Sequence, residues 1–139
     1  MNKFYIINTG VSTIGPLGEA EKELAVLGIT LRSLNILEVD SKLPAGLLKQ
    51  EGGTHADEGE TSMMLYIAPE MVDMSKAAKD FDPRPGRRGL TRDPEGKGNY
   101  SPSGVYGDPT LATREKGRVI VEATVREVVR QVRELIALK

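Results

Sequence analysis

The apolar positions of this chain change their spacing along the sequence, and these changes predict the order of the elements. A continuous apolar run at 4–7 is typical of a strand buried on both faces. Apolar residues at helical spacing then run from Leu17 to Leu27, between a Gly-Pro start and a closing glycine. A second strand is expected at 29–39. Because strand, helix and strand follow one another, the two strands should be parallel.

The second half of the chain reads as helices separated by irregular segments. A loop is expected at 40–53, and a helix at about 58–68 that stops at a proline. Regular spacing is lost at 80–107, a stretch rich in glycine, proline and charge. An Asp-Pro pair then predicts the start of a helix over about 108–138. The expected core stripe of this helix is Val121, Val125, Val128, Val132 and Leu135. The methionines expected to fill the core elsewhere are Met63, Met64, Met71 and Met74.

Composition narrows the possible functions. The 139 residues are enough for a single domain, and the net charge of −1 argues against a nucleic-acid-binding surface. The absence of cysteine excludes disulfides and thiolate metal ligands. The apolar runs are far shorter than the ~20 residues of a membrane span, and no signal peptide is recognisable. A cytoplasmic protein without membrane or nucleic-acid partners is expected.

The candidate chemistry is concentrated between Gly52 and Ser62. This stretch holds the only histidine, His55, followed by acidic residues that include Asp57 and Glu60. In one interpretation, the acids cap the start of a helix and His55 is a hydrogen-bonded loop residue. In the other, His55 moves a proton or binds a metal, and Glu60 is a metal ligand. Their five-residue spacing differs from the i, i+4 pair of the HExxH helix.

Two other segments are weaker candidates. The loop at 8–13 follows the first strand, where ligands collect in open parallel sheets, but it lacks the spacing of a phosphate-binding loop. The irregular segment is locally basic, through Arg84, Arg87, Arg88 and Arg92. Together they suggest a small-molecule binding domain, whereas a plain connection and a solvated loop are the simpler interpretations.

Two strands are too few for a stable parallel sheet, because both edges and both faces need cover. We therefore expect a sheet that is incomplete at the N-terminus. The missing strands would come from another chain or from the preceding part of a longer ancestor.

Three segments together resemble one protein family. GGTHADEGETSMMLYIAPEMVDM closely resembles the signature of the creatininase (creatinine amidohydrolase) family, a His-Ala-Gly-x-x-Glu-Thr-Ser pattern followed by an apolar helix and Pro-Glu-x-Val. SGVYGDPTLATREKG resembles the family's Gly-x-x-Gly-Asp-Pro stretch before the last helix. FYIINTGVST resembles the strand and loop that carry Asn-Gly-His-Gly-Gly-Asn in most members. The three segments occur in the family's order and cover essentially the whole chain.

The resemblance implies a three-layer α/β/α fold with a mainly parallel sheet, of which residues 1–139 form a single domain matching the C-terminal part of the family domain. It also implies a homo-oligomer and a site that hydrolyses C–N bonds of small cyclic or linear amides with a divalent metal (Zn, Mn or Fe). His55 matches the active-site histidine that moves protons to the leaving nitrogen. Glu60 matches the acidic residue of the same motif, as a metal ligand or a partner of the site. Asp57 stands where the family usually has glycine.

The departures from the family concern the metal. Family members bind it mainly through an N-terminal Glu-x-His and a following Asp, for which this chain has no counterpart. Gly10 stands where the family loop carries a further ligand histidine. Catalytic zinc typically needs three protein ligands, so metal activation of water should be weak or absent in this chain alone. The two function hypotheses are a truncated creatininase-like metal-dependent amidohydrolase and a non-catalytic module that assembles with itself or with a full-length relative.

Overall fold

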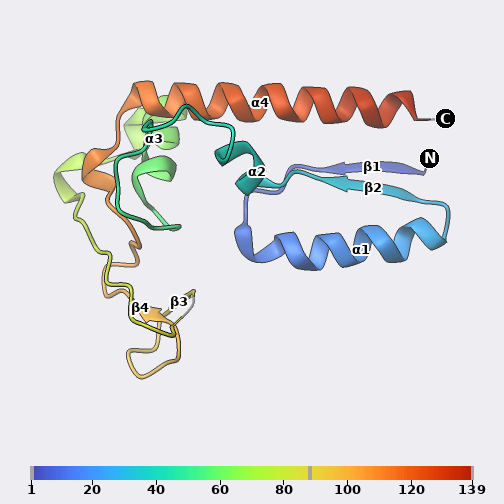
Figure 1. Cartoon of the computed structure of the whole chain (residues 1–139). Coiled ribbons are helices and arrows are strands. Elements are labelled where there is room, and N and C mark those ends of the chain that lie inside the picture. Colours follow the sequence, from blue (N-terminus) through green and yellow to red (C-terminus); the bar gives the residue numbers. More distant parts are fainter. Residues whose placement is uncertain (1, 88, 139) are drawn as a thin grey trace. The chain divides into compact units, whose positions relative to one another are not determined.

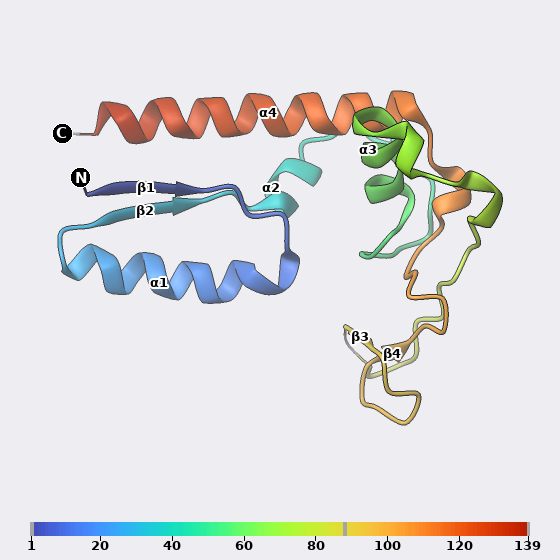
Figure 2. The same ribbon diagram turned by 180° about the vertical axis from the view of Figure 1, so that it is seen from behind.

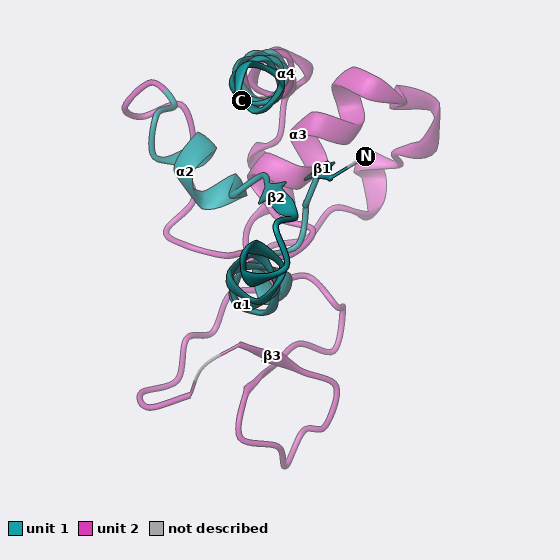
Figure 3. Ribbon diagram, turned by 90° about the vertical axis from the view of Figure 1, so that its right-hand side faces the viewer, with its two compact units in different colours: residues 1–43, 122–139 teal, residues 44–121 magenta. Residues whose placement is uncertain are grey.

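The computed structural model describes residues 2–87 and 89–138, which form two compact units. Unit 1 takes in residues 1–43 and 122–139, and unit 2 takes in residues 44–121 (Figure 3). Of the basic positions expected in the irregular segment, Arg88 lies outside the described residues.

Unit 1 contains the predicted strand–helix–strand unit. Its elements are β1 (Lys3–Ile6), η1 (Val11–Thr13), α1 (Ile14–Val26), β2 (Thr30–Ser33), α2 (Ile36–Asp40) and the second part of α4 (Arg114–Ala137). β1 and β2 pair in parallel, which confirms that prediction. The pair lies between α1 and α4 (Figures 1 and 2). The prediction that the first strand is buried on both faces is wrong, because Phe4 and Ile6 of β1 are 45% and 36% exposed. The fold class is α/β.

Side chains of the two strands alternate between these helices. Tyr5 points to α4, where its hydroxyl donates to the Gln131 side chain at 2.9 Å. Ser33 points to α1 and donates to the Glu21 carboxylate at 2.6 Å. The buried apolar residues of unit 1 are Leu31, Leu34, Val39 and Leu135. The core therefore forms where the strands meet the helices.

The prediction of a strand over 29–39 is wrong after Ser33. Asn35 has extended backbone, and its side chain accepts a hydrogen bond from the Leu37 amide at 3.1 Å, so it caps α2. Its side-chain amide also donates to the Glu38 carboxylate at 3.1 Å. The apolar run did not indicate this helix start, because a short buried helix and a strand can have the same pattern of apolar residues.

Unit 2 is built around α3 and the first part of α4. Its elements are α3 (Glu58–Ile67), η2 (Pro69–Met71), η3 (Met74–Lys76), β3 (Leu90–Thr91), β4 (Asn99–Tyr100), η4 (Pro109–Leu111) and the start of α4. The predicted helix at 58–68 is confirmed. The segment 80–107 is largely irregular, as expected, with β3 and β4 forming a two-residue parallel pair.

The last helix begins later than predicted. Residues at 109–111 form η4, Ala112 is extended, and α4 starts at Arg114. The Ser62 hydroxyl accepts from the Thr113 amide at 3.0 Å, and the Thr113 hydroxyl accepts from the Lys116 amide at 3.2 Å. A side chain on α3 therefore interrupts the helix that the Asp-Pro pair suggested.

Part of the expected core is exposed. Val125 of the predicted stripe is 55% exposed, and Met71 is 74% exposed. The stripe is correct at Leu135, which is 6% exposed. Periodicity identifies the apolar side of a helix, but it does not say how much of that side is covered.

A charged group lies in the interior of unit 2. Glu58 is 0% exposed, and one of its carboxylate oxygens accepts from the Lys116 ammonium. The other oxygen accepts from the amides of Lys49 and Gln50, both at 2.7 Å. Burial by itself would raise the pKa of Glu58, but these donors outweigh it and hold the pKa below its ordinary value. The carboxylate joins the 49–50 loop, α3 and α4.

The two helices of this unit approach each other at a glycine. A Cβ added at Gly117 of α4 would lie 1.8 Å from the Ser62 carbonyl oxygen of α3. Ser62 is fully buried, and its hydroxyl donates to the Glu58 carbonyl oxygen at 2.6 Å. Only glycine allows backbone contact at this crossing.

We predict that Gly117→Ala destabilises the protein by about 2 kcal/mol, because the cost of forcing the helices apart exceeds the helix propensity gained. The measurement is urea unfolding followed by circular dichroism. Gly18→Ala in α1 is the control, since nothing lies within 4 Å of its Cβ position, and it should be neutral or slightly stabilising. Equal effects of the two substitutions would contradict the close approach.

We predict that Lys116→Met destabilises by about 3 kcal/mol at pH 7, because it leaves the buried Glu58 carboxylate without its cation. The ionised carboxylate of the intact pair stabilises the fold above its unfolded pKa, and this contribution is lost as pH falls through the lower folded pKa. The difference between wild type and variant should therefore shrink below about pH 4. Urea unfolding at several pH values measures it.

Lys22→Met is the control, because Lys22 pairs with Glu19 where both side chains are at least 70% exposed. It should change stability by less than about 0.5 kcal/mol. A Lys116→Met effect of the same size at pH 7 and pH 3 would show that the lost interaction is not ionic.

Candidate functional site

His55 is placed by a short backbone bridge. The His55 carbonyl accepts from the Tyr106 amide at 2.8 Å, and the Tyr106 carbonyl accepts from the amides of Thr54 and His55. Gly53 precedes this bridge with a φ of 138°, and a Cβ there would lie 2.4 Å from the Tyr106 carbonyl oxygen. The glycine is therefore required by a close approach of two segments and not only by flexibility.

The imidazole of His55 has a defined tautomer. Its Nδ1 lies 2.9 Å from the Gly104 carbonyl oxygen. Because a carbonyl oxygen only accepts, Nδ1 carries the hydrogen and Nε2 is left with its lone pair in the neutral ring. His55 is exposed, so this nitrogen is accessible for proton exchange. The prediction of a hydrogen-bonded loop residue is confirmed, and the bond leaves the second nitrogen free of that contact.

Asp57 is the N-cap of α3. One carboxylate oxygen accepts from the amides of Gly59 and Glu60, at 2.9 and 3.0 Å, and the other accepts from the Gln50 side chain at 2.8 Å. The residue is 7% exposed. The acidic capping interpretation is confirmed for this residue. Both oxygens of its carboxylate are engaged in structural hydrogen bonds.

Glu60 lies in the first turn of α3 and reaches back along the chain. Its Oε2 accepts from the Ala56 amide at 2.5 Å. Ala56 has a φ of 47°, in the left-handed region that residues with a Cβ rarely adopt. The carboxylate thus holds the peptide that directly follows His55. Glu60 therefore contacts the residue that directly follows His55.

The remaining candidates do not join this turn. In the 8–13 loop of unit 1, the buried Asn8 accepts from the Gly10 amide at 3.1 Å and also from the Thr13 hydroxyl, so the loop is held by its own contacts. In unit 2, Arg87 donates to the carbonyl oxygens of Gly96 and Gly98 and stabilises the irregular segment. These observations favour the structural interpretation of both segments.

The donors present do not fit a complete catalytic metal centre. No group of three histidine, aspartate or glutamate side chains suited to a metal occurs among residues 2–87 and 89–138. Asp57 and Glu58 are occupied by hydrogen bonds and an ion pair. This leaves His55 and Glu60, one fewer than the three protein ligands that catalytic zinc typically has.

Comparison with known proteins identifies the family. The sequence model of creatininase (creatinine amidohydrolase) matches residues 1–132. A mycofactocin precursor peptide peptidase of Mycobacterium ulcerans (strain Agy99) is 38% identical over 87 residues, which are 58% of this chain and 32% of that protein. The chain therefore belongs to the creatininase family.

Solved structures share the fold. A putative creatinine amidohydrolase from Bacteroides fragilis NCTC 9343 is 24% identical, with a TM-score of 0.66 over 97% of this chain and 54% of its own. A mutant creatininase of Zn-Zn type is 25% identical, with a TM-score of 0.62 over 96% of this chain and 56% of its own. A mutant creatininase complexed with creatine is 23% identical, with a TM-score of 0.65 over 96% of this chain and 57% of its own. This chain spans slightly more than half the length of these structures and about a third of the curated relative.

Several residues that hold the site in place were missed from the sequence. Gln50 donates to Asp57 and accepts from the Glu58 amide at 3.0 Å, and Gly104 accepts from His55. A structural role for Glu58 could be expected from the sequence, because an acid at a helix start is expected to meet a cation or amide donors. No such indication exists in the sequence for Gln50 and Gly104, since tertiary contacts alone assign their roles.

No helix in the described residues is long and apolar enough to cross a bilayer.

We predict that Asp57→Ala destabilises by about 1–2 kcal/mol, the typical cost of losing an N-cap side chain, whereas Asp57→Asn loses less. Thermal unfolding monitored by circular dichroism measures the difference. Asp73→Ala is the control, because Asp73 caps the single-turn η3 at an exposed position. A loss at Asp57 no larger than the loss at Asp73 would contradict the buried cap.

Proposed function

We propose that the chain provides the proton-transfer part of a creatininase-like amidohydrolase, which hydrolyses a C–N bond of a cyclic or linear amide. The observation that carries this proposal is the fixed imidazole of His55. With Nδ1 bonded to the Gly104 carbonyl, Nε2 is accessible to take a proton from the attacking water. The same nitrogen would then donate that proton to the departing nitrogen of the amide.

In this proposal Glu60 has a positioning role that supports His55. Its hydrogen bond to the Ala56 amide holds the strained peptide next to His55, and thereby the direction of the imidazole. Its second carboxylate oxygen is where we place the candidate acidic metal ligand of this chain. We keep Glu60 as that candidate ligand.

A divalent metal is the cofactor expected for the family, and relatives are described as Zn-Zn and Mn creatininases. When bound, such a metal polarises a carbonyl and lowers the pKa of water. The described donors of this chain do not fit a full centre, so the proposed step belongs to His55. The substrate is proposed as an amide, either a small amide or a peptide. Assembly as a homo-oligomer and a cytoplasmic location remain predictions.

A non-catalytic module is the second candidate. It is favoured by the single histidine of the sequence and by the structural roles of the neighbouring carboxylates of Asp57 and Glu58. Such a module would act by assembling with itself or with a full-length relative. In that case the His55 side chain would serve only its contact with Gly104.

We predict that His55→Gln lowers amide hydrolysis by at least about 100-fold, because general acid–base catalysis typically contributes 10²–10⁴. Glu60→Gln should lower it less, since an amide oxygen still accepts from Ala56. The assay uses the 139-residue chain with added zinc or manganese, on creatinine, formamides and short peptides. Ammonia or amine release is followed.

Glu70→Gln is the matched control, because Glu70 is an exposed carboxylate of η2 in the same unit. It should leave the rate unchanged. No hydrolysis in any condition by a folded chain would remove catalysis by these 139 residues alone and favour the non-catalytic module. Hydrolysis that survives His55→Gln would show that another group moves the proton.

A further inference from the structure

The outer edge of β2 is open. On the side that faces β1, the Thr30 amide donates to the Asn2 carbonyl oxygen at 2.7 Å. The Leu34 amide donates to the Ile6 carbonyl oxygen at 2.9 Å. Because backbone groups alternate along a parallel strand, the N–H and C=O groups of Leu31 and Ser33 point away from β1. Within the part of the chain that the structure describes, they have no hydrogen-bond partner.

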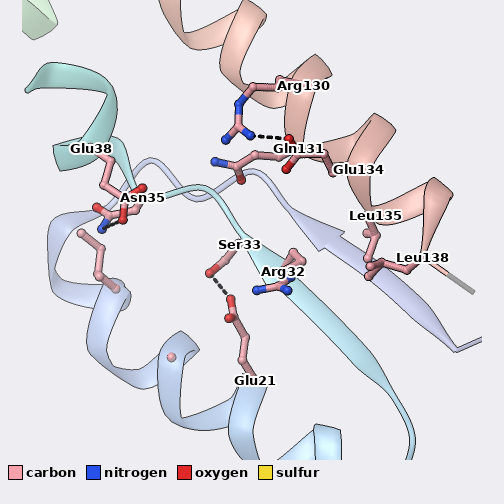
Figure 4. A pocket seen from close by; sticks show the side chains of 12 residues that line it. Glu21, Arg32, Ser33, Asn35, Glu38, Arg130, Gln131, Glu134, Leu135 and Leu138 are labelled. Carbon is pink, nitrogen blue, oxygen red and sulfur yellow. Dashed lines mark hydrogen bonds and ion pairs between the residues drawn. The ribbon is translucent and has the colours of Figure 1, made fainter. Parts of the chain in front are cut away.

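Two adjoining cavities follow this edge. They have volumes of about 490 and 590 Å³, and Gly18, Glu21 and Arg32 line both. All strand residues that line them belong to β2, and none belongs to β1, so the cavities lie on the outer side of β2. The open edge therefore runs along a groove, which we call the β2 groove. Its part near Ser33 lies between α1 and α4 (Figure 4).

Most charged side chains of the β2 groove have a hydrogen-bond or ion-pair partner in the described residues. Glu21 accepts from Ser33, Glu38 accepts from Asn35, and Arg130 pairs with Glu134 at 2.5 Å. Arg32 is exposed, and among the described residues its guanidinium has no ion-pair partner. It lies on the same face of the strands as Tyr5, its register partner. The groove thus offers one free cation beside a row of free backbone groups.

An added strand would satisfy both features. Its backbone would pair with the free groups of Leu31 and Ser33, and an acidic side chain opposite Arg32 would pair with the guanidinium. Both requirements select an extended peptide that carries an acidic residue.

We propose that the β2 groove binds an extended peptide segment of another polypeptide by strand addition, with an acidic side chain opposite Arg32. A second copy of β2 is a poorer occupant, because the strand reads Thr-Leu-Arg-Ser and brings no acid to Arg32. The proposal goes beyond amide hydrolysis, since nothing in it depends on His55. It gives the chain a docking surface for an acidic peptide.

The test measures binding of fluorescein-labelled peptides to the intact chain by fluorescence anisotropy. The probe is an eight-residue peptide of alternating valine and threonine with one central glutamate, and its partner has lysine in place of glutamate. The glutamate peptide should bind about two- to fivefold more tightly at low salt, the range of an exposed ion pair. Arg32→Glu should reverse the preference, while Arg126→Glu, an exposed charge reversal on α4, should not.

Backbone pairing is tested with the protein unchanged. N-methylation of the peptide should weaken binding about tenfold at every second residue and little at the residues between, because only alternate amides face the edge. Hydrogen exchange should slow at the Leu31 and Ser33 amides when the peptide binds. His55→Gln should bind the peptide normally, so failure of the hydrolase proposal would be distinguishable from failure of this one.

Three results would overturn the proposal. The first is no binding of either peptide by the folded chain at millimolar concentration. The second is a binding affinity that changes neither on N-methylation of the peptide nor on Arg32→Glu. The third is occupation of the edge by a second copy, shown by dimer formation and efficient disulfide cross-linking of Leu31→Cys. That cross-link would be unambiguous, because the natural chain has no cysteine.

Discussion

Unit 2 depends on one buried carboxylate. Glu58 has no solvent contact, so its charge is tolerable only if every lone pair direction meets a donor. The donors come from Lys116 on α4 and from the amides of Lys49 and Gln50. Few apolar side chains of the described part of this unit are as deeply buried as Glu58. The same network fixes where α3 begins.

The geometry at His55 follows from that helix start. Asp57 can cap α3 only in an extended conformation, and Gln50 holds its carboxylate from the other side. The preceding residue, Ala56, then adopts a left-handed φ of 47°, which the Glu60 carboxylate stabilises through the Ala56 amide. Strain of this kind persists where surrounding contacts over-determine the backbone. The imidazole is therefore presented by backbone constraints and by a single hydrogen bond of its own.

Unit 1 presents a different situation. Its two strands have helices on both faces, yet their outer backbone groups lack partners among the described residues. Faces are covered by side-chain contacts such as Tyr5 with Gln131, whereas edges require another strand. Family membership and the open edge are separate observations. The family is recognised mainly from the segment around α3, whereas the open edge is a property of β2 in unit 1.

The sequence by itself determined the elements that depend on local signals. Periodicity and capping residues identified β1, α1 and α3, and the His-Ala-x-x-x-Glu-Thr-Ser pattern indicated the family and suggested His55 and Glu60 as candidate site residues. Only the tertiary structure decided where β2 gives way to α2, why α4 begins at Arg114, and that Asp57 is committed to a cap. Each of these depends on partners distant in sequence, such as Ser62 for Thr113 and Gln50 for Asp57. Local patterns carry no information about such partners, because they become neighbours only when the chain folds.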